Sequence, residues 1–268
     1  MKKIWLAIHI LLIAPLFSIA QKEIEIKSFD ERLELAKWMT DYNEITDITG
    51  DSLPKTLRTG QDKAGFEKFC YRDTDAATWH AIYGSLENGA YHINVNFTAN
   101  VYGKVSRGSD APDTLFLNSF ARALINGHKL VPDSFGIPFH QFIMQNQDKT
   151  LSVWLMPAYN YNSHLVPYGC DFYGRFDATG NNLLEKQANI QPLLRSFPLT
   201  NEMAKAKQHD ITLDYRNMDD PPIGGIYFAW RYKGYFRTIS IVTKKSTSLL
   251  QRGNVYNFWW THYERNDE

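Results

Sequence analysis

The densest set of side chains that could do chemistry lies on one predicted strand, over residues 166–177. Four polar residues alternate along it and therefore share one face: Asp171, Tyr173, Arg175 and Asp177. Same-face neighbours on a strand are about 6.5–7 Å apart, and two carboxylates at such separations can flank a glycosidic bond. Arg175 stands between the carboxylates, where its charge lowers both pKa values and suppresses a general acid. We therefore favour a solvated, charge-paired sheet face over a glycosidase site.

His140 is the histidine that is hardest to assign to a purely structural role. It follows Gly136-Ile137-Pro138-Phe139 on a strand predicted over residues 139–145, where a polar side chain can face a groove. Simple exposure is the favoured interpretation, because antiparallel sheets commonly keep one solvated face. His140, Asp171 and Arg175 are the candidate catalytic residues, and a catalytic role requires that they meet in one cleft.

A predicted hairpin decides whether His80 and His92 can share a metal ion. Residues 79–86 and 91–98 are rich in aromatic and β-branched residues, and Asn88-Gly89 between them predicts a two-residue type I′ turn. That turn imposes a register in which these residues face one another: Leu86 and Tyr91, Gly84 and Ile93, Ile82 and Val95, His80 and Phe97. His80 then lies on the apolar face and His92 on the polar face. We therefore predict a core position for His80, a candidate binding position for His92 and no metal site.

Aromatic residues make up 14% of the chain, a high fraction that needs an interpretation. Tyr159, Tyr161 and Tyr168 surround Pro157-Ala158, and rings of this kind can stack on glycans or peptides. An aromatic-rich β core is the favoured interpretation. The three tyrosines join His92 as candidate binding residues.

The chain has two cysteines, Cys70 and Cys170. An exported protein with an even cysteine count can form a disulfide. Cys170, however, alternates with Phe172 and Phe176 on the apolar face of its strand, where a buried free thiol is equally natural. Both interpretations stay open at this point.

Helices are predicted at few places. Ser28-Phe29-Asp30-Glu31 is a capping box and starts the first helix, which apolar residues continue to Met39. The stretch 42–65 is rich in Thr, Asp, Gly and Pro and is predicted as a loop, with a turn of helix as the alternative for part of it. A second helix starts near Ser109-Asp110-Ala111-Pro112 and ends at Gly127, and residues 198–208 have the pattern of a short third helix.

Strands dominate the rest of the chain. The predicted strands from residue 138 onward have these ranges: 139–145, 151–156, 166–177, 183–187, 225–232, 235–243 and 254–260. The pair 225–232 and 235–243 is predicted as a hairpin in which Trp230 meets Arg237 as a cation–π pair. Few helices and sequentially adjacent strands predict an α+β fold, a single domain over residues 21–268 that is mainly antiparallel β-sheet with two or three helices.

The first twenty residues have the pattern of a removable export signal. Lys2-Lys3 is followed by an apolar run over residues 4–17 and by Ser18-Ile19-Ala20, so we predict cleavage before Gln21 and a periplasmic or secreted protein. No later run is long enough for a membrane-spanning helix, which argues against an integral membrane protein. Without Lys2 and Lys3 the chain has 27 basic and 29 acidic residues, a net charge of −2. Nothing here predicts a nucleic-acid partner.

Sequence motifs of the common enzyme classes are missing. The chain has no phosphate-binding glycine loop, no paired-histidine zinc helix, no nucleophile elbow and no C-x-x-C pair. We therefore expect no cofactor, although catalytic groups can lie far apart in sequence.

Several segments together resemble uncharacterised exported proteins of Gram-negative bacteria. The segments that carry the resemblance are 79–84, 153–158, 168–172, 176–180 and 226–230. The resemblance implies a single periplasmic β-rich domain and brings no activity with it.

Three hypotheses of function follow, in order of preference. The first is a non-enzymatic binding or envelope-associated protein that takes an unknown ligand or protein partner through a sheet face or groove. The second is a periplasmic or secreted hydrolase of an envelope or environmental polymer that uses His140, Asp171 and Arg175. The third is a structural component with a flat apolar surface.

Overall fold

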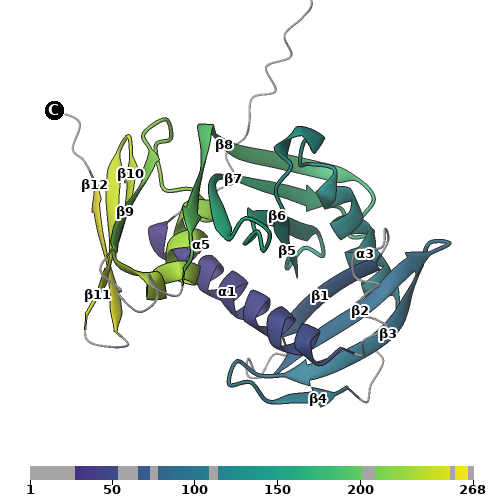
Figure 1. The fold of residues 1–268 in the computed structure, drawn as a ribbon. Helices are drawn as coiled ribbons and strands as arrows, with labels where there is room; N and C mark the ends of the chain where they lie inside the picture. The colour runs from purple at the N-terminus through teal and green to yellow at the C-terminus, as the bar shows by residue number, and fades with distance from the viewer. Residues whose placement is uncertain are drawn as a thin grey trace, which may run out of the picture.

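The computed structural model describes residues 28–53, 66–72, 78–108, 114–200, 209–253 and 257–264. The predicted signal peptide lies outside the described residues, as do residues 201–208 of the predicted third helix. The described part of the chain holds three α-helices and twelve mostly antiparallel strands in three four-stranded sheets (Figure 1). The predicted α+β class is confirmed. No described helix is both long and apolar enough to cross a membrane.

Each sheet is built from strands that are close in sequence. The N-terminal sheet consists of β1 (Phe66–Arg72), β2 (Trp79–Glu87), β3 (Ala90–Ala99) and β4 (Val105–Arg107). The central sheet consists of β5 (Phe139–Gln145), β6 (Leu151–Pro157), β7 (Leu165–Phe176) and β8 (Leu183–Pro198). The C-terminal sheet has the order β12 (Phe258–Glu264), β11 (Ser246–Arg252), β10 (Phe236–Thr243) and β9 (His209–Tyr215), with β9 and β10 parallel.

Helix α1 (Phe29–Asp51) begins at the predicted capping box. The Glu31 backbone N–H donates to Ser28 Oγ at 3.2 Å, and the Ser28 N–H donates to Glu31 Oε2 at 3.1 Å. The prediction of a loop is wrong for residues 42–51, because the helix continues to Asp51, and residues 54–65 lie outside the described residues. Thr46 and Thr49, which are poor helix formers, donate their hydroxyls to backbone carbonyls one turn back and are buried against the sheets. Tertiary burial outweighs the local propensity there.

Helices α1 and α3 (Thr114–His128) cover opposite faces of the N-terminal and central sheets. In β1, Phe69 lies 5.4 Å from Phe120 of α3, while the next residue, Cys70, contacts Thr46 of α1. In β6, Trp154 lies 6.1 Å from Trp38 of α1. Its neighbour Val153 lies against Gly127 of α3. The alternation of side chains along each strand therefore buries both faces.

Helix α5 (Ile223–Tyr232) replaces a predicted strand. Residues 225–232 are aromatic and apolar, and a short apolar run of this kind does not distinguish a strand from a buried helix. Most of the α5 side chains are buried, between α1 and the central and C-terminal sheets. The predicted pairing of Trp230 with Arg237 is also wrong: Lys233 Nζ lies 3.4 Å above the Trp230 ring, and Arg237 pairs with Asp210.

The Asn88-Gly89 turn is confirmed, but the predicted register holds only near it. Asn88 and Gly89 both have positive φ, 51° and 80°, and Leu86 faces Tyr91 as predicted. An extra residue in β3 then shifts the register, so that His80 faces Thr98 rather than Phe97. The shift leaves Tyr83 buried, and half-buried His80 stacks on Tyr71 with 4.7 Å between ring centroids.

Replacing Ser28 by alanine tests the start of α1. We expect Ser28→Ala to lower the free energy of unfolding by about 1 kcal/mol, because the Glu31 backbone N–H loses its acceptor, the Ser28 hydroxyl. Ser52→Ala, at the other end of the same helix, is the matched control, and we expect a change below about 0.5 kcal/mol. Chemical denaturation of both variants measures the difference. Equal losses would contradict a specific role for the capping box.

Candidate functional site

A large cavity lies where α1, β1, β5 and α5 meet. We call it the His140 groove, and its volume is about 990 Å³. Five aromatic side chains line it: Phe139, Tyr159, Tyr161, Tyr232 and Tyr235. Its polar side chains include Asp47, Lys68, His140, Asn160, Asn162 and Arg231. The groove therefore brings together three of the residues predicted from the sequence: His140, Tyr159 and Tyr161.

A tight turn between β6 and β7 holds the aromatic wall in place. Asn160 Oδ1 accepts hydrogen bonds from the backbone N–H groups of Asn162 and Ser163. Tyr159 and Tyr161 pack edge to face, with 4.9 Å between ring centroids, and Tyr161 is 81% exposed. The Tyr159 hydroxyl lies 2.8 Å from His164 Nδ1. An exposed aromatic ring on a fixed turn is ready to stack on a ligand without much loss of conformational freedom.

Three charged side chains from α1, β1 and α5 also line the groove. Arg231 of α5 forms an ion pair with Asp47 of α1, with 2.9 Å between Nη2 and Oδ2. Lys68 of β1 is exposed at the rim. Because the charges of Arg231 and Asp47 cancel, the groove has a net charge of +1, which comes from Lys68.

His140 is neutral at physiological pH. It is half-buried, and desolvation together with the nearby charges of Lys68 and Arg231 lowers its pKa to about 3. A neutral imidazole has one hydrogen-bond donor and one acceptor. It is thus suited to ligand hydroxyl groups rather than to anions.

The three candidate catalytic residues do not form one site. β5 and β7 are separated by β6, so His140 and Asp171 lie about 10 Å apart across the sheet. Arg175 is four residues beyond Asp171 on β7, about 13 Å along the strand. Arg175 forms an ion pair with Asp148 and donates to Thr150 Oγ1 at 3.1 Å. Each of the three side chains therefore has its own, separate surroundings.

Asp171 is buried, and the prediction that it lies on a solvated face is wrong. It is 2% exposed because α5 covers this part of β7. Asn189 Nδ2 donates to its Oδ1 at 2.8 Å, and the Gly224 N–H at the start of α5 donates to its Oδ2 at 3.2 Å. Burial raises the pKa of Asp171 to about 7, although both hydrogen bonds act in the opposite direction. Asp171 thus anchors the N-terminus of α5.

The disulfide interpretation is wrong: Cys70 and Cys170 are both free and buried. Cys70 lies on β1 beside Thr46, whereas Cys170 lies on β7 of the central sheet and packs near Leu155 and Phe172. Burial raises the pKa of each thiol to about 12. Both cysteines therefore act as small core residues rather than as nucleophiles.

The remaining sequence candidates lie elsewhere. His92 is exposed on β3 and does not line the groove. Tyr168 lies on β7 and lines a separate pocket next to β8 and β9. Within the described residues, no three His, Cys, Asp or Glu side chains gather as metal ligands would.

The sequence reasoning missed Asp47, Arg231 and Tyr232. Asp47 was placed in a predicted loop, and the other two in a predicted strand. Helical spacing would have put Arg231 one turn after Tyr227, but the apolar run around it gave no periodic signal.

No known protein family, curated protein or solved structure matches this chain. The resemblance to exported proteins of Gram-negative bacteria therefore stays a prediction. Function has to be argued from the groove itself.

The buried carboxyl of Asp171 predicts a pH-dependent stability. Its pKa is about 7 in the folded protein and near 3.8 when solvated. The contribution of Asp171 to the stability of the fold is therefore fully present below about pH 4, where the carboxyl is protonated in both the folded and the unfolded protein. It is lost as the pH rises through 7. Between pH 4 and 8 we expect the free energy of unfolding to fall, relative to that of Asp171→Asn, by a few kcal/mol and at most about 4. Parallel pH profiles for the two proteins, measured by urea denaturation, would contradict this role.

Proposed function

We propose that this protein is a non-enzymatic binding protein whose His140 groove takes a glycan. The observation that carries the proposal is the composition of the groove walls. Aromatic rings, one of them 81% exposed, line the groove together with planar polar side chains and a neutral histidine. A sugar ring offers an apolar C–H face for stacking and a rim of hydroxyl groups that donate and accept hydrogen bonds.

The size of the groove supports an oligosaccharide rather than a single small metabolite. A volume of about 990 Å³ is at the upper end of the range of about 300–1,000 Å³ typical of ligand sites. Asn160 and Asn162 lie on the same turn as Tyr161, so hydrogen-bonding groups border the stacking surface. Lys68 at the rim favours a glycan that is neutral or carries a carboxylate.

The same surroundings argue against the hydrolase alternative. Catalysis of glycosidic hydrolysis commonly uses two carboxyl groups that flank the bond. Asp47 is the one carboxylate that lines the described groove, and it is paired with Arg231. Asp171, the other candidate, is sealed beneath α5. The pattern of an export signal in residues 1–20 supports a periplasmic or secreted location for the proposed binding activity.

Removing the Tyr161 ring tests glycan binding. A panel of neutral and uronic-acid-containing hexasaccharides is first screened against the mature protein, and each hit is measured by isothermal titration calorimetry. We expect Tyr161→Ala to weaken binding about tenfold or more, because the stacking surface is lost. Tyr102→Ala, which removes a tyrosine that is 92% exposed on another surface, is the matched control and should bind as the wild type does. The proposal fails if no member of the panel binds, or if both variants lose affinity equally.

The neutral state of His140 predicts that binding is insensitive to pH in the range where a solvated histidine titrates. Because the pKa of His140 lies near 3, its charge does not change between pH 8 and 5.5. We therefore expect the dissociation constant of the best hexasaccharide to change less than about twofold over this interval. A transition near pH 6.5 that disappears in His140→Gln would show instead that the imidazole is solvated and titrates.

A further inference from the structure

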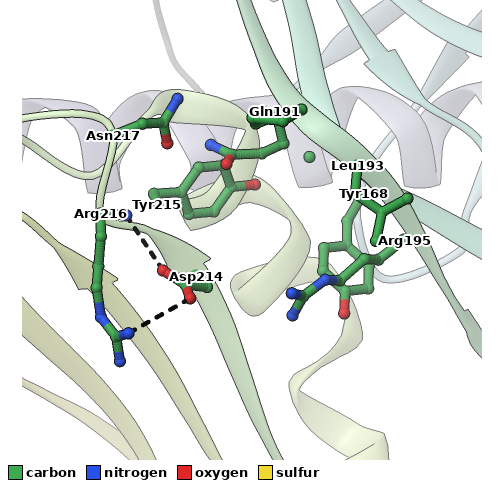
Figure 2. A pocket seen from close by; sticks show the side chains of 10 residues that line it. Tyr168, Gln191, Leu193, Arg195, Asp214, Tyr215, Arg216 and Asn217 are labelled. Carbon is green, nitrogen blue, oxygen red and sulfur yellow. Dashed lines mark hydrogen bonds and ion pairs between the residues drawn. The ribbon is translucent and has the colours of Figure 1, made fainter.

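A second cavity results from an irregularity in the central sheet. Tyr168 of β7 faces Arg195 of β8, and Cys170 faces Ile190. One residue of β7, Gly169, therefore opposes four residues of β8, Gln191–Leu194. This bulge forms one wall of a cavity of about 250 Å³ between β8 and β9, which we call the Tyr168 pocket (Figure 2). Bulges often occur next to functional sites, where they redirect side chains.

The backbone at the bulge is adapted to its shape. Gly169 has a φ of 97°, and a Cβ atom there would lie 3.2 Å from Gln191 Cγ. A larger residue would thus be strained and crowded at this position. Tyr215 of β9 also lines the cavity. It is buried and lies next to Gly225 of α5. The cavity is consequently bordered by β7 and β8 on one side and by β9 on the other.

Two arginines and one carboxylate line the cavity. Figure 2 shows Arg195 and Tyr168 on one side and Asp214 and Arg216 on the other. Asp214 accepts a hydrogen bond from the Arg216 backbone N–H at 3.2 Å and pairs with its guanidinium at 3.7 Å. No ion pair joins Arg195 to Asp214 across the cavity, although both residues are described.

An unsatisfied polar group belongs to a residue that lines the same cavity. Gln191 Nε2 is buried, and no hydrogen-bond acceptor of the described residues reaches it. A buried donor without a partner is costly and is commonly satisfied by a ligand or a water molecule. The rest of the lining includes the Tyr168 and Tyr215 rings and Leu193, which is 67% exposed.

We propose that the Tyr168 pocket binds a free apolar α-amino acid. Its carboxylate would pair with Arg195 and accept from Gln191, its ammonium group would pair with Asp214, and its side chain would pack on Leu193 and the two tyrosine rings. Arg195 on one wall and Asp214 on the other complement the two charges of a zwitterion, and the ammonium group would compete with Arg216 for Asp214. The volume, below the usual range for drug-sized ligands, fits a molecule of this size. This site is independent of the His140 groove.

Three related probes test the proposal by isothermal titration calorimetry on the mature protein. The probes are L-leucine, 4-methylpentanoate, which lacks the ammonium group, and 3-methylbutylamine, which lacks the carboxylate. We expect L-leucine to bind and each analogue to bind about tenfold more weakly or worse. Arg195→Gln should weaken L-leucine binding by a similar factor. Arg237→Gln, which removes an arginine that pairs with Asp210 of β9 outside the pocket, should leave it unchanged.

Several outcomes would overturn the proposal. Equal binding of 4-methylpentanoate would show a simple carboxylate site, and equal binding of the amine would show a cation site at Asp214. Failure of L-leucine to bind would show that the pocket does not take amino acids. Arg195 is exposed, so Arg195→Gln should fold, and its unchanged thermal unfolding and unchanged hexasaccharide binding would separate a local loss from a general one.

Discussion

The architecture depends on the packing of one helix against all three sheets. Phe29 at the start of α1 lies 5.2 Å from Trp260 of the C-terminal sheet. Trp38 in the middle packs on the central sheet, and the Thr49 hydroxyl near the end lies 2.7 Å from the Tyr83 hydroxyl of the N-terminal sheet. Figure 1 shows α1 crossing the molecule in this way. Each sheet has only four strands and must bury a face against another element, and α1 gives all three a common partner.

Both candidate sites lie at junctions between these layers. The His140 groove is located where α1 and α5 approach the edge strands β1 and β5, and the Asp47–Arg231 ion pair joins the two helices there. The Tyr168 pocket is located where the edge strands β8 and β9 of two different sheets meet. Separate twisted sheets do not fit together without gaps at their edges. Polar side chains at such gaps remain accessible to ligands, whereas the faces of the sheets are filled by helices.

The buried carboxyl of Asp171 connects the fold to the groove. Burying an ionisable group is costly unless it is hydrogen-bonded or protonated. Asn189 and the Gly224 N–H satisfy its two oxygens, and the hydrogen bond to Gly224 fixes the first turn of α5. Arg231 and Tyr232 lie on that same helix and line the groove. A residue first considered for catalysis therefore has a structural role, which is to position side chains of the binding site.

The sequence by itself determined the features that depend on neighbouring residues. These features are the capping box at Ser28, the turn at Asn88-Gly89, the first three strands of the central sheet and the α+β class. His140, Tyr159 and Tyr161 were also identified, but not the reason for their proximity. Tertiary structure alone decided that residues 223–232 form a helix and that Asp171 is buried, because Asp171 and Gly224 are 53 residues apart. Alternation and capping depend on residues that are close in sequence, so local patterns predict them. Burial depends on which distant segment covers a surface, and local patterns do not predict that.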